Sequence, residues 1–175
     1  HFDNIDPDPE IQNTFFLDNI NFFNILINSL QNSNYTRMIL RLFANFSYVE
    51  PYCELILSEK IYESIFELLV NDDLPFKLRD DPCLFFCRLF SFSPDNIAVH
   101  PYFTDLFYIT SDVIESSHSS FLTESFFIMF DKLDEYLQKT QIDFNIDIND
   151  ILIYFTDSDD PEIAQWASLK LDPSD

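Results

Sequence analysis

The 175-residue sequence contains no glycine, and this absence restricts its possible folds and activities more than any other feature. An average glycine content of ~7% would place roughly a dozen glycines in such a chain. Turns that need a residue without a Cβ are therefore excluded, among them phosphate-binding loops, the dinucleotide-binding fingerprint and the nucleophile elbow. Most enzyme classes that a motif can identify are excluded with them. We therefore expect a protein that is not an enzyme and holds no cofactor.

The charge of the chain excludes two further classes of partner. Hydrophobic residues make up 47%, enough for a core, but 9 Lys and Arg stand against 31 Asp and Glu, a formal net charge of -22. Nucleic acids and anionic membranes bind surfaces with surplus positive charge, so neither is expected as a partner. No apolar run reaches the ~18 residues of a membrane helix, and no signal-peptide pattern is visible. We expect a cytoplasmic protein, with the nucleus as the alternative.

Similar stretches recur along the chain at nearly constant spacing. Pro9, Pro51 and Pro94 each follow an acidic or hydroxyl residue and are 42 and 43 residues apart. Such pairs predict a helix N-cap followed by proline at the first helical position. Roughly twenty residues later, each apolar helix is expected to end in a polar cluster. These clusters, with a fourth that has no leading proline, lie at 29–34, 68–73, 112–118 and 154–160.

A long apolar segment follows each polar cluster, and we expect each to form a helix. The segments begin at about Tyr35, Asp81, Ser119 and Asp160. The first two are apolar over most of their circumference, which is typical of helices packed between neighbours. Sustained alternation of apolar and polar residues is missing, although residues 142–148 (IDFNIDI) come close to it. The sequence therefore predicts an all-α fold.

A short helix, a second helix, a polar turn and a long third helix, repeated every ~42 residues, predict a right-handed α-solenoid. We expect one domain with repeats at about 9–50, 51–93, 94–137 and, in part, 138–175. The segments LRLFANFS (40–47) and EIAQWASLKL (162–171) resemble the end of the third helix of armadillo repeats. The resemblance covers nearly the whole chain, with the HEAT repeat as the alternative. It implies a scaffold that binds an extended peptide or helical segment along a groove of third helices.

Polar residues on the expected third helices are the candidate groove. Arg37, Arg41 and Asn45 are four apart and form one polar stripe on an otherwise apolar helix. Arginine forks suit a carboxylate, a phosphate or an acidic peptide. The alternative is that these arginines pair with acidic residues of adjacent repeats and hold the stack together. The full candidate set is Arg37, Arg41, Asn45, Arg88, Ser91, Asp131 and Trp166.

Two alternative functions stay open beside the groove-binding adaptor. One is a structural subunit, or a fragment of a larger solenoid or complex, whose apolar faces are buried by other repeats or chains. The other is a carrier of basic cargo, because armadillo import adaptors clamp basic peptides with Trp and Asn one turn apart. Asn45 matches the Asn position, but Arg41 occupies the Trp position, and Trp166 is followed by Lys170. No repeat holds the complete pair, and Trp166 suits a core position at least as well.

The cysteines and one histidine predict no chemistry. Cys53, Cys83 and Cys87 are expected to be buried as small hydrophobic residues, because no further zinc ligands lie near them in the sequence. His118 lies among serines in a polar turn, where neither an orienting carboxylate nor an oxyanion hole is evident. We expect a turn and a helix cap at this position.

One acidic stretch has the alternating oxygen ligands of a calcium loop. Ile148 stands where such a loop needs glycine, and Tyr154 stands where it needs glutamate. We therefore expect a loop and a helix start without a metal. The oxygen-bearing residues are Asp143, Asn145, Asp147 and Asn149.

Overall fold

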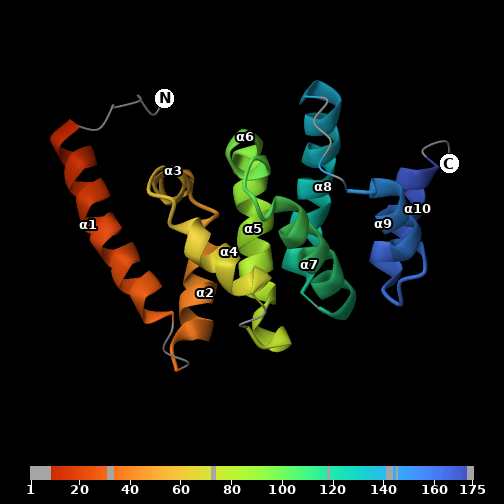
Figure 1. Ribbon diagram of the computed structural model, residues 1–175, viewed down its shortest axis with the longest axis horizontal. Helices are drawn as coiled ribbons and strands as arrows, with labels where there is room; N and C mark the ends of the chain where they lie inside the picture. Colours follow the sequence, from red (N-terminus) through yellow and green to blue (C-terminus); the bar gives the residue numbers. More distant parts are fainter. Residues whose placement is uncertain are drawn as a thin grey trace, which may run out of the picture.

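A computed structural model describes residues 9–30, 34–71, 74–117, 119–140, 144 and 146–172, with side chains from residue 19 onward. Within this part the protein contains ten α-helices, one 3₁₀ helix and no strand. The predicted all-α class is therefore confirmed. Figure 1 shows the helices as successive layers along one long axis, from α1 at one end to α9 and α10 at the other.

The long apolar segments form four of the helices, α2, α5, α8 and α10, and each begins within one residue of its predicted start. The chain begins with α1 (Pro9–Ser29) and α2 (Thr36–Phe46). It continues with α3 (Glu50–Ser58), α4 (Tyr62–Val70), η1 (Phe76–Leu78) and α5 (Asp80–Phe92). The remaining helices are α6 (Pro94–Ala98), α7 (Phe103–Ser116), α8 (Ser120–Thr140), α9 (Ile148–Thr156) and α10 (Pro161–Leu171).

The first layer differs from the predicted three-helix pattern. α1 runs for 21 residues without a break, where the pattern predicts a short helix and a second one. After Pro9 the helix contains neither proline nor glycine, the two residues that most strongly interrupt a helix. The layers α3–α4–α5 and α6–α7–α8 each contain the three helices that the pattern predicts.

Side-chain caps are present at fewer of the helices that begin near a proline than the sequence predicts. Asp160 caps α10, because its carboxylate accepts a hydrogen bond from the Glu162 N–H at 2.9 Å. The cap positions of α3, α5 and α6 hold Val49, Arg79 and Ser93, and none of these side chains makes a capping hydrogen bond. The helices α3 and α5 begin one residue earlier than expected, so their acidic residues lie inside the first turn. A carboxylate there still interacts favourably with the positive end of the helix dipole.

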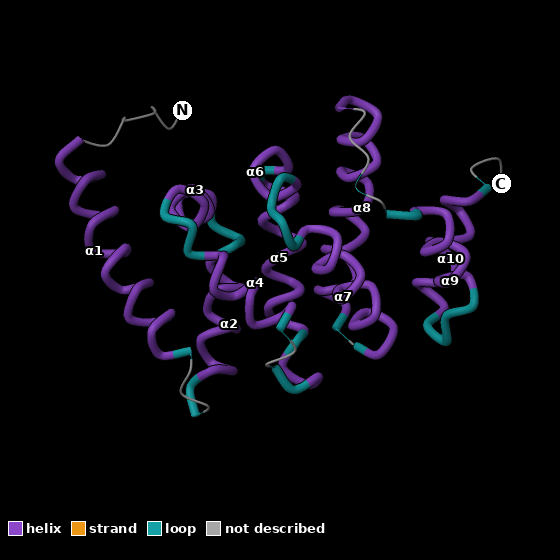
Figure 2. The backbone as a smooth tube through the Cα atoms, in the orientation of Figure 1, coloured by secondary structure: helices purple, strands orange, loops and turns teal. Residues whose placement is uncertain are grey.

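α5 is the central helix of the molecule (Figure 2). All nine residues from Pro82 to Phe90 are buried, and the helix packs against α2, α8, α4, α6 and α7. The Phe85 ring lies 5.9 Å from that of Phe43 on α2 and 6.3 Å from that of Phe66 on α4, both edge-on. Such edge-to-face pairs add to the free energy gained by burying the rings. The prediction of a helix packed on all sides is confirmed for α5.

α2 is instead buried on one side only, which corrects the prediction for that helix. Its buried residues are Thr36, Ile39, Leu40, Phe43 and Ala44, and its polar stripe is exposed. Arg37, Arg41 and Asn45 therefore lie on the surface of the protein, where a binding partner could reach them.

Hydrogen bonds between the layers join residues that are 37 to 44 positions apart in the sequence. Because the contacts advance in the same direction on both helices of a pair, α2 and α5 run parallel, and so do α5 and α8. The pairs are Arg41–Asp81, Ala44–Arg88, Asp80–Ser117, Ser91–Lys132, Thr104–Phe144 and Tyr108–Asp147.

The turn between α3 and α4 shows how the chain reverses without glycine. The Ile61 N–H bonds to the Ile56 carbonyl at 3.0 Å, and the Lys60 N–H bonds to the Leu57 carbonyl at 3.2 Å. This pair of bonds is the Schellman motif, whose C′ position is usually glycine. Lys60 occupies that position with φ 53°, the one positive φ among the described residues.

The three cysteines are free and buried, as expected. Burial raises the pKa of Cys53 to about 11 and that of Cys83 to about 12, and it raises the pKa of Cys87 as well. None of the described helices combines the length and the apolar character that a bilayer crossing requires.

We predict that thiol reagents will not label the folded protein at about pH 8, because the thiolate is the reactive species and these thiols stay protonated in the fold. Incubation with dithionitrobenzoate should release no thionitrobenzoate from the native protein. The same protein in guanidinium chloride should react at its three cysteines. Rapid labelling of the native protein would contradict the described packing around α5.

Candidate functional site

A pocket of about 470 Å³ opens over the junction of α2, α5 and α8. Its rim holds two exposed aromatic side chains, Tyr48 from the turn after α2 and Phe121 from the first turn of α8. Leu84 of α5 and Ala44 of α2 form buried apolar parts of its wall. The remaining lining residues are polar: Arg41, Asn45, Asp81 and Ser119. The pocket thus contains two of the predicted groove residues, Arg41 and Asn45.

Arg41 joins α2 to α5. Its Nε donates a hydrogen bond to Oδ1 of Asp81 at 2.8 Å, and its side chain is 62% exposed whereas that of Asp81 is 14% exposed. Burial raises the pKa of the Asp81 carboxyl, although the positive charges of Arg41 and Arg37 oppose this shift. Arg41 therefore pairs with an acidic residue of the next layer, as the alternative interpretation of the sequence expects, while much of its guanidinium remains accessible. Arg37 lies exposed one turn earlier on α2.

Arg88 contacts two of the residues that line the pocket, Ala44 and Tyr48, and is only 8% exposed. Its Nη1 donates a hydrogen bond to the Ala44 carbonyl at 2.7 Å, in the last turn of α2. Its guanidinium carbon lies 3.0 Å from the centre of the Tyr48 ring. Burial lowers the pKa of Arg88 to about 10, so the side chain is still charged at neutral pH.

The other predicted residues lie along the helices away from the pocket. The Ser91 carbonyl accepts a hydrogen bond from Lys132 of α8, and Asp131 forms an ion pair with Lys170 of α10. Trp166 stacks on Phe127 of α8 with ring centroids 4.2 Å apart and an angle of 10° between the planes. Trp166 is thus occupied in packing α10 against α8.

Four cations therefore link neighbouring layers, and we call them the interlayer cations: Arg41, Arg88, Lys132 and Lys170. Two of them act in the same way, since Arg88 binds a carbonyl in the last turn of α2 and Lys132 binds one in the last turn of α5. A cation at this end of a helix is stabilised by the helix dipole. Sequence reasoning had not singled out Lys132.

Tyr48 and Phe121 were also not among the site residues predicted from the sequence. Both stand next to helix ends, where the apolar periodicity of the helix gives no signal for an exposed aromatic side chain. Tyr48 lies three residues after Asn45 and therefore close to the same stripe, a position that could have drawn attention to it.

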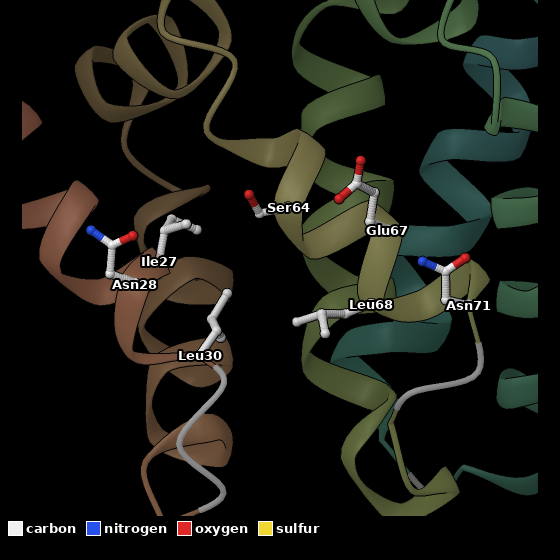
Figure 3. A pocket seen from close by; sticks show the side chains of 7 residues that line it. All are labelled: Ile27, Asn28, Leu30, Ser64, Glu67, Leu68 and Asn71. Atoms are coloured by element: carbon white, nitrogen blue, oxygen red, sulfur yellow. The ribbon is translucent and has the colours of Figure 1, made fainter.

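A second pocket, of about 380 Å³, lies between α1 and α4 (Figure 3). Ile27 of α1 and Leu30, the residue after α1, face Leu68 of α4 across it, and its lining contains no cation. The polar residues around it are Asn28, Ser64, Glu67 and Asn71. This pocket offers apolar contact but no group that would select a charged ligand.

The remaining described polar residues, among them His100 and Asp147, contribute little to a site. His100 accepts a hydrogen bond from the Tyr102 N–H at 3.3 Å, and burial lowers the pKa of its imidazole. Asp147 caps α9 by accepting from the Asp150 N–H, so the predicted helix start is confirmed. His118, Asp143 and Asn145 lie outside the described residues. The described side chains hold no group of three His, Cys, Asp or Glu residues that could bind a metal ion.

Comparison of the chain with protein-family models, with curated proteins and with solved structures gives no match. The chemistry of the site is therefore inferred from its residues. Two exposed aromatic rings, a side-chain amide, an exposed arginine paired with a carboxylate and a buried arginine are groups that recognise a ligand.

We predict that the Arg41–Asp81 pair contributes only about 0.2–1 kcal/mol to the free energy of unfolding, because Arg41 is largely solvated. A double-mutant cycle with Arg41→Gln and Asp81→Asn, followed by urea denaturation, measures this coupling directly. A coupling well above that range would show that the pair holds α2 and α5 together. Lys77→Gln, at an exposed site in η1, controls for the loss of one positive charge.

Proposed function

We propose that this protein is a non-catalytic interaction scaffold that binds a segment of a partner protein across the face of α2, α5 and α8. The observation that carries the proposal is the pocket at their junction, with Tyr48 60% and Phe121 65% exposed on its rim. Exposed aromatic side chains beside a pocket are typical of residues that dominate the binding energy of protein interfaces.

The architecture that we propose is an α-solenoid of armadillo-like repeats. Two observations support it: the layers α3–α4–α5 and α6–α7–α8 have the same helix order, and hydrogen bonds between layers recur at 37 to 44 residues. In such a fold each unit buries its apolar face against the next one. The parallel helices α2, α5 and α8 would then form the continuous inner face.

The polar groups of the pocket suit a partner in an extended conformation. An extended segment presents main-chain N–H and C=O groups that need hydrogen-bond partners, and an asparagine amide can donate and accept at once. Asn45 is exposed on the pocket rim between Arg41 and Tyr48. The aromatic rings on the two sides of the pocket would hold apolar side chains of the segment.

The test begins with selection of twelve-residue peptides from a random library against the immobilised protein. Hydrogen exchange of the protein with and without a selected peptide should show protection in α2, α5 and the start of α8. Phe121→Ala should weaken binding about fivefold or more, since truncating a central aromatic contact commonly costs over ~1 kcal/mol. Fluorescence anisotropy of labelled peptide measures the affinity.

Ile153→Ala is the matched control, because Ile153 is 55% exposed but lies on α9. We expect this variant to bind the peptide as the wild type does. If hydrogen-exchange protection is confined to α4 and α7, or if both variants lose the same affinity for the peptide, the peptide binds away from the pocket. Either result would contradict the proposal.

A second candidate function is that of a structural subunit in a larger assembly. It is favoured by the large apolar side chains that α9 and α10 expose, namely Ile153, Tyr154, Leu169 and Leu171. Sedimentation at increasing concentration tests self-association, for which we expect a shift above 20.8 kDa that Ile153→Glu with Leu169→Glu abolishes. A monomer at all concentrations would contradict assembly through copies of this chain.

A further inference from the structure

Arg88 combines a positive charge, burial and incomplete hydrogen bonding. Of its three guanidinium nitrogens, Nη1 is bonded to the Ala44 carbonyl. The other two, Nε and Nη2, are buried and have no hydrogen-bond partner. A buried donor without a partner costs roughly 1–3 kcal/mol, and more when it is charged. The structure therefore keeps two charged donors unsatisfied next to Ala44 and Tyr48, which line the pocket.

The partner that Arg88 lacks is an anion. The sequence has 31 Asp and Glu residues, but none of the described carboxylates lies within ion-pair distance of Arg88. Two neighbours offset part of the cost, the Ala44 carbonyl at the negative end of the α2 dipole and the face of the Tyr48 ring. Because Arg88 is already desolvated in the fold, pairing it with a counter-ion requires desolvation of the counter-ion alone.

The unsatisfied atoms have the geometry that carboxylates recognise. Nε and Nη2 form one edge of the planar guanidinium, and their two N–H groups point the same way, so a carboxylate can accept both at once. Because each guanidinium nitrogen is bonded to the carbon that lies 3.0 Å from the centre of the Tyr48 ring, Nε and Nη2 lie against that ring as well. A ligand that binds this edge needs no change in the bond from Nη1 to Ala44.

Tyr48 connects Arg88 to the pocket. It lines the pocket together with Ala44 and Leu84, and the same Ala44 bonds to Arg88, which lies one helical turn after Leu84 on α5. Tyr48 itself is 60% exposed and stands in the short turn between α2 and α3. A rotation of this exposed side chain would open Arg88 to the pocket without disturbing the packing of the helices.

We propose that Arg88 recognises an aspartate or glutamate side chain of the bound segment through its Nε–Nη2 edge, with Tyr48 as a movable cover. This inference rests on the proposed function, because it names the chemistry that the same pocket selects. The net charge of -22 repels a strongly acidic segment at long range. We therefore expect one acidic residue among neutral or basic neighbours in the segment.

The test uses the selected twelve-residue peptides, synthesised with amidated C-termini so that the only carboxylates are those of side chains. Each peptide is compared with a version whose acidic residue is changed to the corresponding amide. The wild-type protein should bind the amide version about tenfold or more weakly, as expected for loss of charge-assisted hydrogen bonds. Arg88→Met, which removes the charge but keeps an apolar stem, should bind both versions alike.

Two matched variants locate the effect. Arg41→Met removes the exposed arginine of the pocket, and Arg79→Met removes an arginine that bonds to the Leu74 carbonyl before α5. Both variants should keep the difference between the acidic peptide and its amide version. If Arg41→Met abolishes that difference and Arg88→Met preserves it, the carboxylate binds Arg41 and the inference is wrong.

Tyr48→Ala tests the inference without altering Arg88, and it serves also if Arg88→Met fails to fold. Removal of the cover should keep or increase the preference for the acidic peptide. A Tyr48→Ala protein that binds both peptide versions equally would overturn the inference.

Peptide selection distinguishes a failure of the proposed function from a failure of the inference about Arg88. Selection that yields no binding peptide overturns the proposed function, and this inference with it. Selected peptides that bind at the pocket but contain no acidic residue, or whose acidic residue can be changed without loss, overturn this inference alone.

Discussion

The burial of α5 on all sides is the constraint on which the rest of the structure depends. A helix with nine successive buried residues cannot exist at the surface of a small domain, so it requires neighbouring helices around most of its circumference. α2 and α8 lie on two sides of it, α4, α6 and α7 pack on further sides, and the pocket opens over Asp81 and Leu84. The small buried side chains of Cys83 and Cys87 fit this crowding, because they fill volume without needing strong hydrogen-bond partners.

The same constraint explains where the few positive charges lie. A cation bound to a particular carbonyl or carboxylate of the next layer adds a specific polar contact to the apolar packing between the layers. Each of the interlayer cations has this role, and two of them bind carbonyls at helix C-termini. Arg88 differs from the other three because the surrounding helices bury it. Its position between two layers places an incompletely bonded guanidinium against two residues that line the pocket, Ala44 and Tyr48.

Much of the fold could be predicted from the sequence, and less of the site. The starts of α2, α5, α8 and α10 were predicted within one residue, since polar clusters and prolines mark helix ends by local chemistry. The burial of Arg88 could not be predicted, because it depends on the turn that brings Tyr48 over α5. The sequence indicated that Arg41 could pair with an acidic residue of an adjacent repeat. It did not indicate that this residue is Asp81, since the partner depends on how α2 and α5 are aligned. Asn45 was placed correctly on an exposed stripe because helical spacing alone determines that face.

The turn at Lys60 has a consequence for the unfolded chain. Because Lys60 is the one described residue with a positive φ, the other described turns use backbone conformations that any residue with a Cβ can adopt. Glycine at those turns would add nothing to the folded state, but it would enlarge the number of conformations open to the unfolded chain. A sequence without glycine therefore loses less conformational entropy on folding. Part of the stability of this protein arises from the restricted backbone of its denatured ensemble and is visible in no native contact.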